Sequence, residues 1–181
     1  MRLTIRTLLL AGLLSSLAGV ANAQTRLLVN CFWAPQHYVC QSVLPKWLEQ
    51  VKEVTEGRVT GIIPPKSVAA PPEQLNSVEK GITDVAVQFN GLIQGRVTGP
   101  LVAMNPFIAT TDAPAMSEAL WETRNKFFPD EMESVHLLSL WVITPAELFS
   151  QTDKPLNSME DLVSRKIWAL PGALAATMKK I

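Results

Sequence analysis

The residues of this sequence that are most capable of chemistry are two cysteines, Cys31 and Cys40, and two histidines, His37 and His136. The cysteines lie nine positions apart. They can form a disulfide in an oxidising compartment, or they can be two separate buried thiols. The distance between their Cα atoms decides between these states, and the sequence does not contain it. None of the four residues has the spacing of a known zinc site, so we expect no metal.

A catalytic role for the same residues has little support. Cys31 and His37 would serve as thiolate and base, but nothing in the sequence orients the histidine, and a disulfide to Cys40 would remove the thiol. No Gly-x-Ser-x-Gly elbow or phosphate-binding glycine loop is present. His136 alternates with apolar neighbours, which is typical of a structural histidine. We therefore predict a protein that is not an enzyme and needs no cofactor.

Composition limits the class of protein further. Of the 181 residues, 48% are hydrophobic, which excludes disorder and indicates one or two globular domains. The formal net charge is zero, so the sequence has no basic excess for a nucleic-acid partner.

The first 23 residues have the pattern of a secretory signal peptide. Arg2 and Arg6 precede an apolar run from Thr7 to Val20, and a small-x-small cleavage site ends at Ala23. The alternative is an uncleaved anchor, but the run is shorter than the ~20 residues that span a bilayer. We expect cleavage after Ala23 and a periplasmic protein.

After the signal peptide, the spacing of the apolar residues alternates between the pattern of strands and the pattern of helices. Strands are predicted at 26–33, 58–65, 83–90, 135–143, 146–151 and 166–170, with a further extended stretch at 100–108. Helices are predicted from about Leu44 to Gly57, over 72–81 and 115–128, and as a short turn at 157–165, with another beginning near Thr177. This alternation predicts an α/β fold with a mostly parallel sheet flanked by helices.

In such sheets ligands bind beyond the carboxyl ends of the strands. Two groups of residues follow or end predicted strands and could contact a small molecule: Trp33, His37 and Tyr38, and then Gln88, Phe89 and Asn90. The alternatives are that Tyr38 lies on a helix surface and that Phe89 packs with Val85 and Val87. The proline-rich loop with Ser67 and Glu73 is better explained as a stiff surface loop.

Four stretches, in this order, carry a family resemblance: "VTEGRVTGIIPP", "EQLNSVEKGITDVAVQ", "NPFI" and "TDKPLNSMEDLVSRKIWALPG". Together they resemble the DctP-type periplasmic solute-binding proteins of TRAP transporters, over Leu27 to Gly172. The resemblance implies a periplasmic-binding-protein-like lobe and a small organic solute. It also implies delivery of that solute to TRAP membrane subunits driven by an ion gradient.

The same resemblance implies two lobes in a chain about twice as long as this one. Residues 24–149 then correspond to most of lobe one, and residues 150–181 to the start of lobe two, so we expect a truncated sequence. The alternative is that the last strand and helix dock on the preceding sheet. Two other functions stay open, namely an exported sensor or interaction module on the same fold, and a non-functional fragment.

Trp168 departs from the family pattern. The strand that corresponds to "KIWAL" usually carries, at the position of Trp168, an arginine that binds the ligand carboxylate through two parallel hydrogen bonds. A second arginine of some members, near Leu148, is also missing. An indole offers an aromatic face and one N–H donor. We expect Trp168 to line the cleft, with core packing as the alternative, and the ligand to depend less on a carboxylate: an aromatic acid, an amide or alcohol, or a cationic osmolyte.

Overall fold

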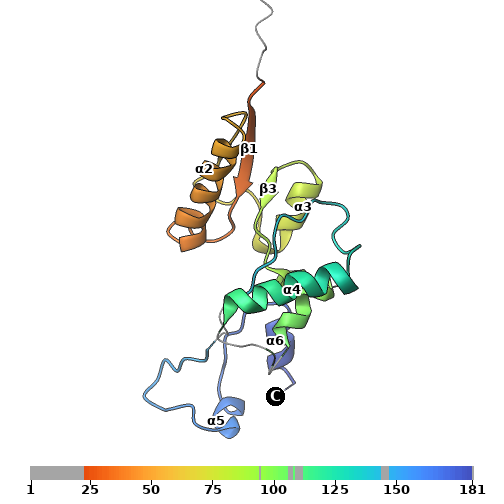
Figure 1. Ribbon diagram of the computed structural model, residues 1–181. Coiled ribbons are helices and arrows are strands. Elements are labelled where there is room, and N and C mark those ends of the chain that lie inside the picture. The colour runs from red at the N-terminus through yellow and green to blue at the C-terminus, as the bar shows by residue number, and fades with distance from the viewer. Residues whose placement is uncertain (1–22, 94, 106–107, 109–111, 144–146, 181) are drawn as a thin grey trace, which may run out of the picture.

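The computed structural model describes residues 23–93, 95–105, 108, 112–143 and 147–180. Its first part is a three-stranded parallel sheet of β1 (Thr25–Asn30), β2 (Val59–Ile62) and β3 (Val85–Ala86), in the order β2-β1-β3 (Figure 1). Residues Thr25 and Val29 of β1 pair with β2 and β3 respectively. The predicted parallel α/β fold is confirmed. Nearly all of the predicted signal peptide lies outside the described residues.

The central strand β1 is the most buried part of the sheet. Val29 is fully buried and packs with Cys31, Val39, Cys40 and Leu44, the first core cluster. These residues come from the end of β1, from a π-helical turn (Val39–Val43) and from α2 (Leu44–Val54). The proline that follows Leu44 lies in the first turn of α2, where a missing N–H costs little, so it begins the helix rather than kinking it.

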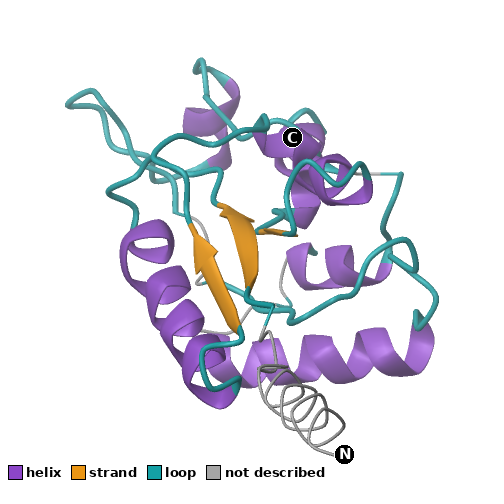
Figure 2. Ribbon diagram, turned by 90° about the horizontal axis from the view of Figure 1, so that it is seen from above, coloured by secondary structure: helices purple, strands orange, loops and turns teal. Residues whose placement is uncertain are grey.

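Helices flank the strands on two sides. After β2, a 3₁₀ turn (Pro71–Glu73) leads into α3 (Gln74–Glu79), and Figure 1 shows α2 and α3 on opposite sides of the strands. Figure 2 gives the view from above, in which the helices that Figure 1 places below the strands are seen around them. The longest of the described helices, α4 (Ala113–Phe127), is close to the predicted range. No helix among the described residues is both long and apolar enough to cross a membrane.

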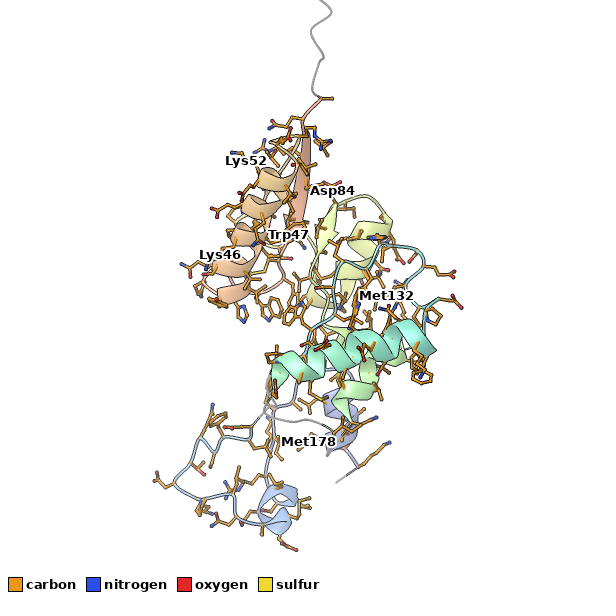
Figure 3. All side chains as sticks on the ribbon, viewed as in Figure 1. Lys46, Trp47, Lys52, Asp84, Met132 and Met178 are labelled. Atoms are coloured by element: carbon orange, nitrogen blue, oxygen red, sulfur yellow. A yellow bond between two sulfur atoms is a disulfide. The ribbon has the colours of Figure 1, made fainter. Side chains whose placement is uncertain are left out.

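A second core cluster lies under α3. Leu75, Ile93 and Val97 are buried there, and Met132, labelled in Figure 3, packs against them with Leu101 and Val135. Beside this cluster Arg96 donates to both carboxylate oxygens of Glu79, at 2.6 and 3.1 Å, and Ser134 donates to the same carboxylate. The guanidinium of Arg96 is the main reason that the pKa of Glu79 lies below its ordinary value.

The stretch 100–108 was predicted to be extended, and this prediction was wrong for residues 100–104. Residues Gly99–Met104 form a 3₁₀ helix with proline in its first turn. Its amino end is held by Glu131, whose two carboxylate oxygens accept from the N–H groups of Thr98 and Gly99, at 2.8 and 2.9 Å. The capping carboxylate comes from a residue more than thirty positions away, so local sequence could not have indicated it.

The predicted strands at 135–143, 146–151 and 166–170 are also wrong. Within the part of the chain that the structure describes, none of these segments pairs with a neighbouring strand. A strand exists only where its N–H and C=O groups meet those of a partner. One backbone N–H of the first segment, that of Val142, instead donates to the Ser117 hydroxyl at 2.8 Å.

The short turn predicted at 157–165 is present as α5 (Met159–Val163). Ser158 and Asp161 form a capping box, because the Ser158 hydroxyl accepts from the Asp161 N–H and the Asp161 carboxylate accepts from the Ser158 N–H. The last helix, α6 (Ala173–Met178), contacts the 3₁₀ turn Asn90–Leu92 that follows β3. Met178 marks this helix in Figure 3.

Candidate functional site

A hollow of about 220 Å³ opens at the carboxyl ends of β1 and β2. Parallel strands bring these ends to one edge of the sheet, which is where ligands bind in folds of this class. Its lining is mostly apolar and consists of Cys31, Trp33, Pro35, Cys40, Pro45, Ile63, Pro64, Pro65 and Ser67. Of the predicted contact residues, Trp33 lies directly on this hollow.

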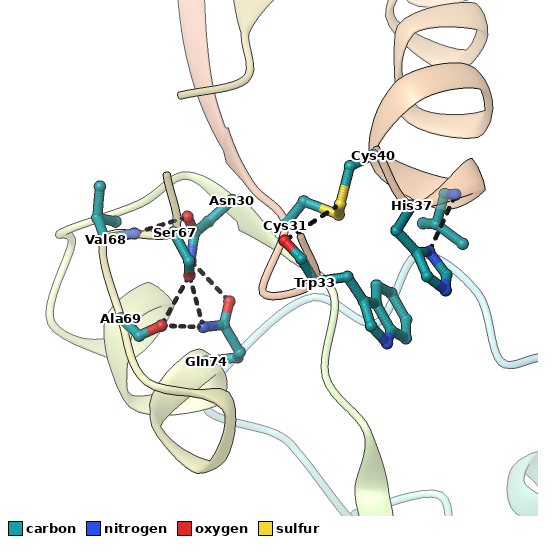
Figure 4. Close-up of a disulfide and its surroundings, with 10 residues drawn as sticks. Asn30, Cys31, Trp33, His37, Cys40, Ser67, Val68, Ala69 and Gln74 are labelled. Atoms are coloured by element: carbon teal, nitrogen blue, oxygen red, sulfur yellow. Dashed lines mark hydrogen bonds between the residues drawn. A yellow bond between two sulfur atoms is a disulfide. The ribbon is translucent and has the colours of Figure 1, made fainter. Parts of the chain in front are cut away.

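Cys31 and Cys40 form a disulfide that lines the same hollow (Figure 4). Of the two states left open by the sequence, the structure therefore has the bridge. The Cα atoms are 5.7 Å apart, and both cysteines are buried. The sulfur of Cys31 is bonded to Cys40, so the thiolate that a Cys31–His37 catalytic pair would need is absent.

An aromatic wall of four residues, Phe32, Trp33, His37 and Trp141, stands beside the disulfide. The rings of Trp33 and His37 stack with centroids 4.6 Å apart and planes 6° apart. Phe32 stacks on Trp33 at 4.0 Å, and Trp141 lies tilted at 6.3 Å from it. The Nδ1 atom of His37 accepts from the Val39 N–H at 3.3 Å, which leaves Nε2 as the ring nitrogen available to a solute.

Trp141 was not predicted to be part of the site. It lies in the segment that the sequence indicated as a strand, and only the fold brings it to Trp33 from more than a hundred positions away. Tyr38, which was predicted, points largely to solvent with 67% of its surface exposed. It precedes the π-helical turn at the start of the helical region, so the helix-surface alternative describes its position in this structure.

A buried amide network supports the hollow from the side of the proline-rich loop (Figure 4). Asn30 is fully buried, and its side-chain NH₂ group donates to the Ser67 hydroxyl at 3.0 Å and to the side-chain amide oxygen of Gln74 at 2.7 Å. Its own carbonyl oxygen accepts from the Val68 N–H at 3.1 Å. Gln74 in turn donates to the Ala69 carbonyl at 2.9 Å. The loop is therefore tied to the end of β1.

Sequence reasoning missed Asn30 and Gln74. The available signal was weak: an asparagine ends an otherwise apolar strand, and a glutamine sits in the first turn of a short helix. Neither position indicates that the two side chains, 44 residues apart in the sequence, form a hydrogen bond with each other.

Gln88 uses its amide inside the protein. Its carbonyl oxygen accepts from the Leu75 N–H at 3.0 Å, which caps α3, and its NH₂ group donates to the Phe89 carbonyl at 2.8 Å and to the Pro71 carbonyl at 3.5 Å. In this arrangement Gln88 positions α3 on β3. Asn90 differs, because no hydrogen bond joins its half-buried side chain to another described residue.

Phe89, which stands between Gln88 and Asn90 in the sequence, is half-buried. Its ring lies close to the buried Gly91, where an added Cβ would come within 2.7 Å of the Phe89 ring. The following turn, Asn90–Leu92, is the segment that α6 contacts. The structure therefore brings Asn90 near the last helix and not into the lining of the hollow with Trp33.

Trp168 is 81% exposed in this structure and belongs to neither of the two core clusters. It lines a second hollow of about 440 Å³ with apolar residues of α5, of α6 and of the segment between them, and with Arg165 and Lys179. Arg165 is already engaged, because it donates to the carbonyls of Lys154 and Pro155 at 3.0 and 2.9 Å. The two hollows share no lining residue.

No group of three or more metal-ligating side chains comes together among the described residues. The arrangement at the end of β1 therefore offers stacking surface, apolar contact and a few neutral hydrogen-bonding groups. These are the properties of a site for a small, largely apolar organic molecule.

Comparison with known proteins gives a consistent set of relatives. No family model matches the chain. The chain is 40% identical over 177 residues to a protein of Comamonas testosteroni named as the outer membrane transporter protein TsaT. That match covers 96% of this chain and 52% of the relative, so the chain spans about half the length of the curated relative.

Solved structures of TRAP solute-binding proteins share the fold. A Bordetella bronchiseptica protein described with bound mandelate is 31% identical, with a TM-score of 0.59 over 65% of this chain and 38% of that chain. A Rhodoferax ferrireducens protein described with copurified benzoate is 27% identical, with a TM-score of 0.62 over 67% of this chain and 38% of that chain. A marine metagenome protein at 22% identity matches in fold alone, with a TM-score of 0.66 over 77% of this chain and 43% of that chain.

The resemblance to the TRAP solute-binding proteins is therefore confirmed, and the fold is that of a lobe of these proteins. The named structural neighbours are binding proteins and not enzymes, which agrees with the expectation from the sequence.

Proposed function

We propose that this chain takes part in capturing a small aromatic acid for a TRAP-type transporter. One observation carries the proposal: Trp33 stacks with His37 and Phe32 at the carboxyl end of β1, beside a hollow of about 220 Å³. Aromatic rings prefer offset or edge contacts with other rings, and such pairs contribute about 0.5–1.5 kcal/mol beyond simple burial. The wall therefore favours a ring over an aliphatic chain of the same size.

The aromatic acid is chosen from the ligands left open by the sequence for two reasons. Trp168 replaces the arginine of the family pattern, so a charged clamp for a dicarboxylate is missing at that position. The two neighbours at 31% and 27% identity are described with mandelate and benzoate, which are aromatic monocarboxylates. Both features suit a ligand that is held mainly through its ring.

The division of the chain follows from the same proposal. Residues 24–149 supply most of lobe one, and residues 150–181 begin lobe two, whose Trp168 would face the solute when two lobes close over it. Trp33, His37, Tyr38, Phe89 and Asn90 are the contacts proposed for lobe one. Gln88 contributes by holding α3 in place, and delivery of the solute to membrane subunits completes the proposed role.

We further propose that the protein is exported to the periplasm and cleaved after Ala23. The charged, apolar and small-residue regions of the first 23 residues support this. N-terminal sequencing of the protein recovered from the periplasm should begin at Gln24. Recovery of a chain that still begins at Met1 in the membrane fraction would contradict the cleavage.

The test of the ligand class is calorimetric titration of the protein with benzoate and with cyclohexanecarboxylate, which keeps the carboxylate but lacks the aromatic ring. We expect tighter binding of benzoate, and a loss of about tenfold or more in the variant Trp33→Ala because the stacking face is removed. Trp121→Phe is the matched control, since Trp121 lies on α4 and lines neither hollow.

Equal binding of the two acids, together with no effect of Trp33→Ala, would contradict the aromatic assignment. A separate titration with succinate tests Trp168. If succinate bound as tightly as benzoate and Trp168→Ala left its affinity unchanged, the proposed preference for a ring over a second carboxylate would be wrong.

A further inference from the structure

We propose that the Cys31–Cys40 disulfide positions the aromatic wall, so that solute affinity depends on the sulfur–sulfur bond itself. The inference rests on the proposed function, because it assigns the bond a role in binding aromatic acids. Four features of the structure support it: where the bond is anchored, what lies between its ends, how few contacts hold that segment, and where the sulfurs lie.

The two ends of the bond are anchored to rigid parts of the fold. Cys31 directly follows β1, whose last residue, Asn30, is fixed by the parallel ladder and by the buried amide network. Cys40 lies in the π-helical turn that continues into α2. Both cysteines are buried and belong to the first core cluster. The bond therefore joins the central strand to the first helix.

The segment between the cysteines contains three of the five proposed lobe-one contacts, Trp33, His37 and Tyr38. Few hydrogen bonds hold it: the His37 N–H donates to the Ala34 carbonyl at 2.8 Å, the His37 ring accepts from the Val39 N–H, and the His37 carbonyl accepts from the Gln41 N–H at 2.9 Å. The first two bonds stay inside the segment, and the third joins it to the π-helical turn but not to β1. The disulfide is therefore the covalent tie that sets the segment relative to β1 and α2.

The stack between Trp33 and His37 depends on the path of this segment. The two rings are nearly parallel although their residues are four positions apart in a non-helical turn. Holding the ends of the segment at a Cα separation of 5.7 Å restricts the turns that it can adopt. A site whose contact groups are held in place before binding loses less freedom on binding, and this raises affinity.

The disulfide also lies on the hollow, because Cys31 and Cys40 line it together with Trp33. Breaking the bond frees two thiols at the floor of the site and allows the segment to shift into the space that a solute ring would take. A disulfide with a purely structural role elsewhere in the fold would have no such effect on affinity at temperatures where the protein stays folded.

The experiment compares three forms of the protein: oxidised, reduced, and the double variant Cys31→Ala with Cys40→Ala. Reduction uses dithiothreitol, which gives its two thiol hydrogens to the cysteine sulfurs and becomes a cyclic disulfide. Far-UV circular dichroism selects a temperature at which all three forms are folded. Two quantities are then measured: the Kd for benzoate, and the indole N–H resonance of Trp33, assigned through Trp33→Phe.

We expect reduction and the double variant to raise the Kd by about tenfold, to move or broaden the Trp33 resonance, and to leave the resonance of Trp121 unchanged. Reoxidation of the reduced protein should restore the original Kd and the original Trp33 resonance. In the Trp33→Ala background the redox state should no longer change the Kd, because the positioned group is gone. This last comparison separates positioning from a general loss of stability.

An unchanged Trp33 resonance on reduction would overturn the inference, whatever the affinity for benzoate. An unchanged Kd in the reduced and double-variant forms would also overturn it. A different result, in which the oxidised protein binds no aromatic acid while reduction still moves the Trp33 resonance, would contradict the proposed ligand class and leave the positioning of the wall by the disulfide intact.

Discussion

The buried amide of Asn30 is the most informative single position for the stability of the site. The variant Asn30→Ala removes three hydrogen bonds at once: to the Ser67 hydroxyl at 3.0 Å, to the Gln74 oxygen at 2.7 Å and from the Val68 N–H at 3.1 Å. Asn30 and Gln74 are both fully buried, so water does not replace the lost partner at the Gln74 oxygen.

The expected loss follows from these contacts. A buried hydrogen bond contributes about 1 kcal/mol net, and a stranded buried acceptor adds a cost of about 1–3 kcal/mol. Three bonds and one stranded oxygen give a decrease of about 4–6 kcal/mol in the free energy of unfolding. This is a large fraction of the ~5–15 kcal/mol typical of a folded domain.

Urea denaturation followed by circular dichroism measures this quantity, with Asn105→Ala as the matched control. Asn105 is exposed, so its truncation should change stability by less than about 0.5 kcal/mol. A double-mutant cycle with Ser67→Ala should give a coupling energy of about 0.5 kcal/mol or more, because the two side chains are bonded. A loss below about 1 kcal/mol for Asn30→Ala would refute the reasoning.

Two further predictions concern a charge pair beside α3 and the packing of β2. Arg96 holds the pKa of the Glu79 carboxyl below its ordinary value of 4.5, so the stabilisation by Glu79 is present above pH 4.5 and is lost as the pH falls through the lowered pKa. Glu79→Gln should therefore have a lower free energy of unfolding than wild type at pH 7, and this free energy should fall less than that of wild type on acidification. Equal pH profiles of the free energy of unfolding in the two proteins would contradict the pairing. In β2, an added Cβ at Gly61 would lie 2.5 Å from Leu48 Cδ2 and 3.2 Å from the Leu27 carbonyl oxygen. Gly61→Ala should therefore destabilise by about 1 kcal/mol in urea denaturation, and should cost less in a Leu48→Ala background if the clash is the cause.

The parts of the fold that sequence reasoning predicted correctly are those with local signals. The strand β1 follows from a run of apolar residues, and α2 follows from an apolar face at helical spacing. The turn at 157–165 was also predicted, and the capping box of Ser158 and Asp161 that the structure shows there is a local interaction. Each of these signals lies within about one element of the chain.

Two of the wrong predictions concern segments whose partners are distant in the chain. Residues 135–143 have the composition of a strand but meet no strand among the described residues, and the Val142 N–H bonds to Ser117 instead. Residues Gly99–Met104 form a 3₁₀ helix whose amino end binds the Glu131 carboxylate. Apolar composition indicates that a segment will be buried, but it does not indicate which other segment will pack against it.

The same division holds for the candidate site. The sequence by itself determined the parallel α/β class, the resemblance to TRAP solute-binding proteins and the presence of Trp33 and His37 after the first strand, because these depend on residue types and their spacing. Only the tertiary structure decided that Cys31 and Cys40 are joined, that Asn30 binds Gln74 and that Trp141 reaches Trp33, since each contact depends on two segments meeting in space. Side chains far apart along the chain form a site only when the packing of the core brings them together.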